Sequence, residues 1–174
     1  MAEEKLERVF LEFSARKLEQ FTRRVGDCLQ RLSYEQIWGR GSGNENAAGN
    51  LVLHLCGNVR QWIGAGVAGM PDVRERDEEF SARGGFQAQD LINRLESTVA
   101  EAAGVIRAVS AERLRERISV QGYEITVLEA IYHDVEHFAQ HTGQIIFITK
   151  AATGRDLGYY AHLKNSPGKT GMIP

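Results

Sequence analysis

The chain has 174 residues, of which 43% are hydrophobic and 25% are charged, and its formal net charge is −2. Such a composition is typical of a chain that folds around a hydrophobic core, and the length suits one domain spanning 1–174. The small net charge and the lack of a long basic block argue against nucleic-acid binding. The sequence contains no apolar run that resembles a membrane span or a secretory signal, so we expect a cytoplasmic protein with no membrane partner.

Hydrophobic periodicity predicts four long helices, because apolar residues recur at steps of three or four over each segment. The predicted helices span 3–32, 45–68, 88–109 and 126–152. Thr126 and Glu129 have the spacing of a capping box at the start of the last helix, and Gly154 is placed to end it. Four long amphipathic helices favour an all-α four-helix bundle.

The segments between and after these helices are less regular. The connection 70–86 is long and dense in charges of both signs. Long connections are often functional, although a solvated crossover is the simpler interpretation. Residues 118–125 alternate weakly between apolar and polar, and we expect them to be too isolated to form a sheet. We expect the tail beyond Asn165 to be poorly ordered.

Two cysteines, Cys28 and Cys56, fall inside predicted helices among apolar neighbours. They form neither a C-x-x-C motif nor a disulfide framework. Because free cysteine packs like a small hydrophobic residue, we expect two buried, reduced thiols.

Histidines recur at every fourth position of the last predicted helix, as His133, His137 and His141. Residues four apart share one face of an α-helix, so His137 and His141 reach toward one point. His54 lies on the apolar stripe of the second predicted helix, where a single histidine is more often a core residue than a ligand. Burying several imidazoles is costly unless each finds a partner, and one divalent metal satisfies three at once. We therefore predict a metal site formed by His54, His137 and His141.

Three protein ligands leave a coordination position open, as in catalytic zinc sites. Imidazole ligands do not fix the metal, and we expect zinc, nickel, manganese or iron, with copper also compatible. His133 drifts from the inward stripe and is placed outside the ligand set. Asp134 and Glu136 are candidates to accept the other ring N–H of a ligand, although a solvated face is the simpler role. Gln144 and Asn58 would contact either a water at the metal or a neighbouring helix.

Residues 50–62 (NLVLHLCGNVRQW) and 137–144 (HFAQHTGQ) together resemble the DinB/YfiT superfamily, and more closely a branch of it whose function is undefined. Residues 76–80 and 154–160 also resemble that branch. The resemblance implies an up-down-down-up four-helix bundle, often dimeric, that binds a divalent metal through three histidines. The matching positions here are His54, His137 and His141. Some members of the superfamily are thiol S-transferases that use bacillithiol, mycothiol or glutathione, and others have no known activity.

Two functions are compatible with these features. The first is a metal-dependent thiol S-transferase, in which the metal lowers the pKa of a low-molecular-weight thiol that attacks a small electrophilic substrate. A metal-dependent hydrolase is a variant of this hypothesis. The second is a non-catalytic, stress-related bundle that a metal stabilises and that binds a partner. We place the enzyme first and expect a homodimer, with Arg74, Arg76 or Arg83 as candidates to pair with a carboxylate of the thiol.

Overall fold

The computed structural model describes residues 5–161, so the predicted disorder beyond Asn165 lies outside the described part of the chain. In chain order the elements are α1 (Leu6–Leu29), α2 (Tyr34–Trp38), α3 (Ala48–Val59), η1 (Arg60–Val67), α4 (Arg76–Ser81), α5 (Ala88–Ala108), η2 (Arg113–Arg115), β1 (Arg117–Val120), β2 (Tyr123–Thr126) and α6 (Val127–Thr153). The element η1 is a π-helix that continues α3, and η2 is a single 3₁₀ turn.

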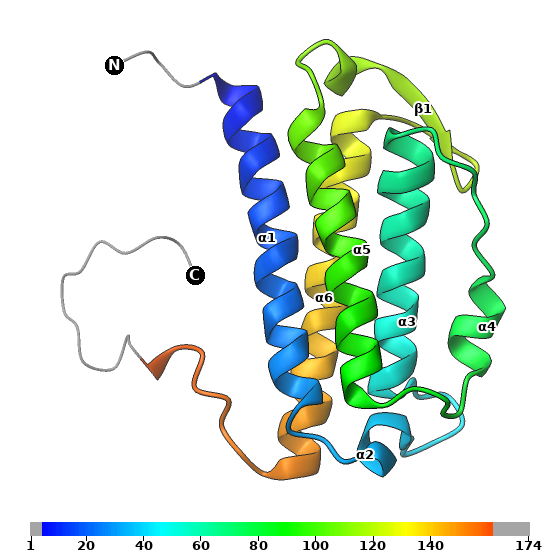
Figure 1. Ribbon diagram of the computed structural model, residues 1–174, viewed down its shortest axis with the longest axis vertical. Coiled ribbons are helices and arrows are strands. Elements are labelled where there is room, and N and C mark those ends of the chain that lie inside the picture. The colour runs from blue at the N-terminus through cyan, green and yellow to red at the C-terminus, as the bar shows by residue number, and fades with distance from the viewer. Residues whose placement is uncertain (1–4, 162–174) are drawn as a thin grey trace.

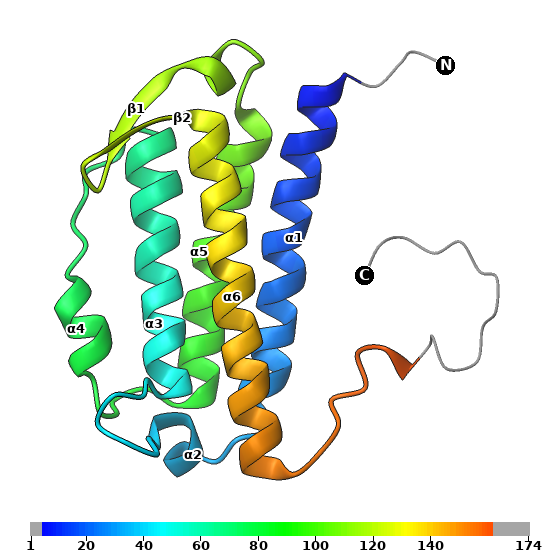
Figure 2. The ribbon, with the colours of Figure 1, turned by 180° about the vertical axis from the view of Figure 1, so that it is seen from behind.

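The four long helices α1, α3, α5 and α6 form a bundle, which confirms the predicted all-α four-helix architecture (Figures 1 and 2). In Figure 1 α1 and α6 run downward, whereas α3 and α5 run upward. Because α3 and α5 point the same way, the chain between them must travel back along the bundle, which explains the length of the connection 70–86. We call residues 70–86 the crossing segment.

The crossing segment is fastened to α3 and is more than a solvated connection. It carries α4 and lies along the outside of α3 (Figure 1). The side-chain amide of Asn50 donates to the carbonyls of Glu79 and Ala82, both at 2.9 Å. Arg40 donates to the Phe80 carbonyl and to the Asn50 side-chain oxygen, both at 2.7 Å. These hydrogen bonds fix the position of α4 relative to the first turns of α3.

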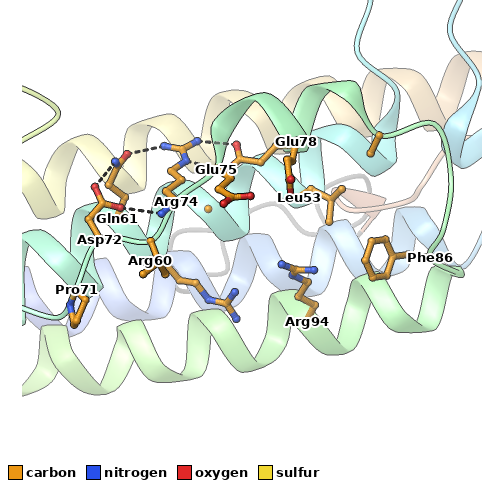
Figure 3. A pocket seen from close by; sticks show the side chains of 14 residues that line it. Leu53, Arg60, Gln61, Pro71, Asp72, Arg74, Glu75, Glu78, Phe86 and Arg94 are labelled. Atoms are coloured by element: carbon orange, nitrogen blue, oxygen red, sulfur yellow. Dashed lines mark hydrogen bonds and ion pairs between the residues drawn. The ribbon is translucent and has the colours of Figure 1, made fainter.

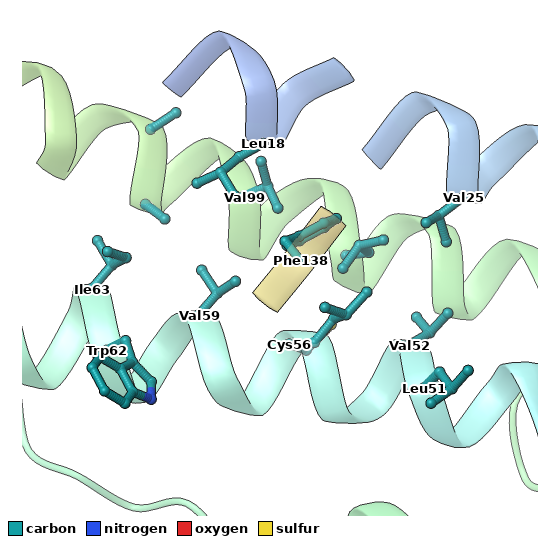
Figure 4. Packing of buried hydrophobic residues seen from close by; sticks show 14 of the residues in the cluster. Leu18, Val25, Leu51, Val52, Cys56, Val59, Trp62, Ile63, Val99 and Phe138 are labelled. Carbon is teal, nitrogen blue, oxygen red and sulfur yellow. The ribbon is translucent and has the colours of Figure 1, made fainter. Parts of the chain in front are cut away.

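The hydrophobic core lies between the four long helices, where Leu18, Val59, Val99 and Phe138 meet from α1, α3, α5 and α6 (Figure 4). Cys56 belongs to this cluster, and burial raises the pKa of its thiol to about 11. Both cysteines are free and buried, as predicted. Within residues 5–161, no helix combines the length and hydropathy that a membrane crossing needs.

The prediction that 118–125 forms no sheet was wrong, because β1 and β2 pair as an antiparallel hairpin. Gln121 and Gly122 form its two-residue turn with φ of 52° and 80°. Positive φ at both turn residues matches the twist of a tight hairpin. The hairpin is not isolated: it packs against η1, and a Cβ added at Gly66 of η1 would lie in van der Waals contact, 3.5 Å from side-chain atoms of Ile118 and Val120.

Both predicted ends of the last helix are confirmed. The Thr126 hydroxyl accepts from the Glu129 amide at 3.2 Å, and the Glu129 carboxylate accepts from the Thr126 amide at 2.7 Å. Gly154 ends α6 in the left-handed conformation, with φ of 67°. This reciprocal cap and glycine stop set the bounds of the helix that carries two of the candidate ligands.

Candidate metal centre

The three predicted histidines lie together in the structure. His54 projects from α3, and His137 and His141 project from successive turns of α6. The Nε2 atom of His137 lies 3.1 Å from the Nε2 atom of His54 and 3.1 Å from that of His141. One ligand atom from each residue falls within 4.8 Å of the other two. The antiparallel course of α3 and α6 thus brings together side chains from distant parts of the sequence.

Hydrogen bonds at the opposite ring edges indicate which nitrogens carry protons. The Nδ1 atom of His54 lies 2.9 Å from Oε2 of Glu79, and the Nδ1 atom of His141 lies 2.7 Å from Oε1 of Gln144. Carboxylate and amide oxygens only accept hydrogen bonds, so each Nδ1 is the donor. In the neutral imidazoles, both Nε2 atoms therefore keep their lone pairs for the point where the rings converge.

Arg74 lies about as close to Nδ1 of His54 as Glu79 does, but it does not hydrogen-bond to the ring. Its Nη2 atom lies 3.0 Å from Nδ1 of His54 and 2.8 Å from Oε2 of Glu79. A guanidinium only donates, and a protonated Nδ1 cannot accept, so the Arg74 hydrogen goes to the carboxylate. Because Nε of Arg74 also donates to Oε1 of Glu79 at 2.8 Å, the two side chains form a bidentate pair.

Glu79 is the residue of the candidate site that the sequence did not single out. Burial by itself raises its pKa, but hydrogen bonds from Arg74 and His54 outweigh burial and hold the pKa below its ordinary value. A Cβ on Gly57 would lie 1.8 Å from Oε1 of Glu79, so only glycine at that position lets the carboxylate lie against α3. The one available sequence signal was this glycine on the helix that carries His54.

Arg74 is itself held in place between the crossing segment and the helix formed by α3 and η1, where its side chain is buried (Figure 3). Its Nη1 atom donates to the side-chain oxygen of Gln61 at 2.9 Å, and the amide of Gln61 donates to Asp72 at 2.6 Å. These residues line a cavity of about 400 Å³ whose wall also includes Arg60 and Arg94. A chain of hydrogen bonds through Arg74, Gln61 and Asp72 therefore orients Glu79. Of the three histidines, only His54 takes part in it.

His137 lies at the centre of the cluster. Burial, followed by the charges that His141 and His54 would carry, lowers the pKa of His137 to about 3. Burial also lowers the pKa of His141. Both rings are therefore neutral at physiological pH, and neutral imidazole is the form that coordinates a metal.

The other candidates on α6 fall into different roles. His133 lies outside the cluster, as predicted, with its ring 4.0 Å from the Trp62 ring. Glu136 is exposed, in agreement with the solvated role. Asp134 is not on a solvated face but completely buried, and its carboxylate has no partner among the described residues. Burial raises the pKa of Asp134 to about 7. Gln144 contacts the His141 ring directly, which neither of its two expected roles anticipated.

The cluster opens into a cavity of about 720 Å³. Its wall includes the three histidines, Asn58 and Trp62 of α3 and η1, Arg76 and Phe80 of α4, and Tyr123 of the hairpin. Of the three arginine candidates, Arg74 and Arg76 belong to this wall. Arg83 does not; it donates to the carbonyls of Phe80, Ser81 and Ala82 at the end of α4. The histidine cluster is thus reachable by a small molecule.

Comparison with known proteins supports the fold and leaves the activity open. The chain matches the family described as "Protein of unknown function (DUF1572)" over residues 5–164. The structure of a conserved protein from Enterococcus faecalis is similar, with 16% identity and a TM-score of 0.72, over 83% of this chain and 97% of that one. The DinB-like protein YjoA from Bacillus subtilis is 12% identical with a TM-score of 0.65, over 84% of this chain and 96% of that one.

None of the curated proteins compared with the chain matches it. At these identities the solved structures establish the fold and nothing about chemistry. The resemblance to the DinB/YfiT superfamily is therefore confirmed for the fold, and the function has to be argued from the site itself.

Proposed function

The chain belongs to the DUF1572 family of unknown function, and we propose that it is a metal-dependent enzyme in which His54, His137 and His141 hold a divalent ion. The observation that supports this proposal is the convergence of three Nε2 atoms beside an accessible cavity. A closed site would suit a structural ion, whereas three ligands facing a cavity suit a site where a small molecule reacts.

The residues present fit such an ion. Two of the three converging nitrogens have their lone pairs directed inward by Glu79 and Gln144. The Nε2 atom of His137 lies 3.1 Å from both of the others, so either the single proton of the neutral His137 ring or a cation must lie between these nitrogens. The low pKa of His137 excludes only the doubly protonated ring, which could not bind a cation. Neutral imidazoles suit zinc, nickel and iron(II), whereas manganese prefers oxygen ligands. We therefore place zinc, nickel or iron(II) ahead of manganese.

The reaction class that we propose is thiol S-transfer. A divalent ion at this site would lower the pKa of a thiol and so favour the nucleophilic thiolate at neutral pH. The thiol sulfur forms a bond to an electrophilic carbon, the thiol proton passes to solvent, and the electron pair displaced at carbon leaves with the departing group. Trp62, Phe80 and Tyr123 supply an apolar wall for the electrophile, and Glu79 keeps the His54 ring in its required orientation.

The metal proposal is tested by titrating untagged, chelator-treated protein with zinc, nickel and manganese. Wild type should bind one equivalent of zinc, and His141→Ala should bind far more weakly. His133→Ala is the matched control, because it removes a histidine from the same helix outside the cluster. Equal loss of zinc in the two variants, or no zinc binding by wild type, would contradict the assignment.

The transferase proposal is tested separately, with metal-loaded protein. Monochlorobimane is offered with cysteine, glutathione, bacillithiol and mycothiol, and conjugation is followed by fluorescence. Conjugation that depends on both the metal and His141 supports the proposal. Metal binding without conjugation of any thiol rejects S-transfer and leaves two alternatives, of which ester hydrolysis by the loaded protein would favour the hydrolase and chelator-induced unfolding the stabilised bundle.

A further inference from the structure

The turn of the β-hairpin departs from the sequence that its backbone favours. Gln121 has φ of 52° and is the only non-glycine residue at positive φ among the described residues. Tight hairpin turns with positive φ favour asparagine or glycine at this first position, because most other side chains are disfavoured there. A glutamine that accepts this unfavourable backbone conformation indicates that its side chain serves some purpose other than forming the turn.

The Gln121 side chain reaches η1. Its Nε2 atom donates to the Oε1 atom of Gln61, which also accepts from Nη1 of Arg74 at 2.9 Å. A carbonyl oxygen has two lone pairs, so these two donors occupy both. The Nε2 atom of Gln61 donates to Asp72 at 2.6 Å, and Figure 3 shows Gln61 bonded to both Asp72 and Arg74. The Gln61 amide is therefore fixed jointly by the hairpin turn and the crossing segment.

The same chain of hydrogen bonds continues to the candidate metal centre. The Arg74 side chain is 4% exposed, and its Nε and Nη2 atoms donate to the two carboxylate oxygens of Glu79 at 2.8 Å each. Oε2 of Glu79 accepts from Nδ1 of His54 at 2.9 Å. Four consecutive hydrogen bonds therefore join Gln121 to the ring of a candidate ligand.

The hairpin turn also borders the cavity into which the histidine cluster opens. Gln121 and Tyr123 belong to the wall of that cavity, together with the three histidines. Both side chains are exposed, whereas Gln61 is half-buried beneath the turn. A molecule that enters the cavity therefore meets the hairpin turn and the histidine cluster at the same time.

We propose that Gln121 is a positioning residue for the metal centre: it fixes Gln61, and through Arg74 and Glu79 it holds the His54 ring in the orientation that a divalent ion needs. The inference rests on the proposed function for the ion alone, because the hydrogen bonds are present without it. Groups that orient the ligands of a metal influence its affinity although they do not touch it. The proposal gives the glutamine in the turn a purpose and links the wall of the cavity to the metal site.

Gln121→Asn and Gln121→Gly test the proposal, because they separate the side chain from the turn. Both residues suit positive φ, so the chelator-treated variants should unfold in urea at a midpoint no lower than that of wild type. Neither residue has a side-chain amide as long as that of glutamine, so the hydrogen bond to Gln61 is lost. Zinc affinity, measured by competition with a chromophoric chelator, should fall about three- to fivefold, as expected for one hydrogen bond between neutral groups.

Ser119→Ala is the matched control, because Ser119 is an exposed polar residue of the same hairpin that belongs to neither cavity wall. It should keep wild-type zinc affinity. A double-mutant comparison locates the path of the effect: in protein that already carries Glu79→Gln, the change Gln121→Asn should cause no further loss of zinc affinity.

A second measurement needs no metal. In chelator-treated wild type, the Nδ1 proton of His54 is hydrogen-bonded to a carboxylate and should give a downfield ¹H NMR signal, which Glu79→Gln should displace. Exchange of this proton with water should be faster in Gln121→Asn and Gln121→Gly than in wild type, because the Glu79 carboxylate is held less firmly. Ser119→Ala should leave the exchange rate unchanged.

Each contrary result has a distinct meaning. Wild-type zinc affinity in both Gln121 variants, or a loss that is equally large when Glu79 is already glutamine, overturns the positioning role and leaves the metal site standing. A urea midpoint that falls together with zinc affinity overturns it too, because the side chain would then stabilise the fold in general. Absence of zinc binding by wild type rejects the proposed function instead. In that case an unchanged exchange rate of the His54 proton in the Gln121 variants rejects the positioning role as well.

Discussion

Asp134 should make the folded protein less stable as the pH rises toward neutrality. Burial raises the pKa of its carboxyl from 3.8 to about 7. Between about pH 4 and pH 7 the folded protein holds this proton and the unfolded chain does not. Stability conferred by the protonated group is fully present near pH 4 and is lost as the pH approaches 7. The shift of roughly 3 units corresponds to a loss of up to about 4 kcal/mol in the free energy of unfolding.

The perturbation that isolates this effect is Asp134→Asn, which keeps the shape and removes the titration. Urea denaturation of wild type and variant, followed by circular dichroism in chelator, gives their free energies of unfolding at pH 4.5, 6 and 7.5. The other titrating groups cancel in the difference between the two proteins. That difference should move in favour of the variant by roughly 3–4 kcal/mol between pH 4.5 and 7.5.

A difference that stays constant within about 1 kcal/mol over this range would refute the reasoning, because the carboxyl would then be solvated or paired. Zinc-loaded protein should show a smaller difference, since Asp134 precedes His137 by three residues on one helix and a nearby cation favours the carboxylate.

The remaining predictions concern the support of the site and the framework of the fold. Glu79→Gln should lower zinc affinity by about 10- to 100-fold with all three ligands intact, and Glu75→Gln, in the same segment, should leave it unchanged. Gly57→Ala should lower zinc affinity as well, because its methyl group displaces the Glu79 carboxylate; wild-type affinity would show that Glu79 does not orient His54. Thr126→Ala should cost about 1 kcal/mol in urea denaturation, and a loss below the fitting error would mean that the cap is redundant. Cys56 should react with Ellman's reagent at pH 8 only after unfolding, because its thiol is buried with a pKa near 11; rapid labelling of folded protein would contradict that burial.

Helical spacing explains why the meeting of His54, His137 and His141 could be predicted. His137 and His141 share a face because they are four residues apart on one helix, and His54 lies on the inward stripe of a second helix. Both facts depend on local periodicity, which a sequence displays directly. The structure agrees that the three residues meet, because α3 and α6 pack side by side along the bundle.

Glu79 could not be predicted in the same way. It is one of several acidic residues in the crossing segment, and only the path of that segment across α3 separates it from Glu75, Asp77 and Glu78. That path is set by tertiary hydrogen bonds from Arg40 and Asn50 to backbone carbonyls. Periodicity carries no information about such contacts.

The predictions for Asp134 and for residues 118–125 were wrong for related reasons. Aspartate is mostly exposed, so sequence reasoning placed Asp134 in solvent, although its helical phase matches that of Phe138 in the core. Residues 118–125 were expected to be too isolated to form a sheet, because the hairpin is supported by η1, which is distant from it in sequence.

The histidine cluster has a consequence for how the chain can be divided. His54 and His137 are 83 positions apart, and the tight turn at Gln121 and Gly122 lies between them in sequence. A chain cut at that turn would carry one histidine of the cluster in its first fragment and the other two in its second. Neither fragment alone contains all three histidines of the cluster. Zinc binding through these three nitrogens would therefore show that the fragments have reassociated, and it would provide a spectroscopic signal for fragment complementation.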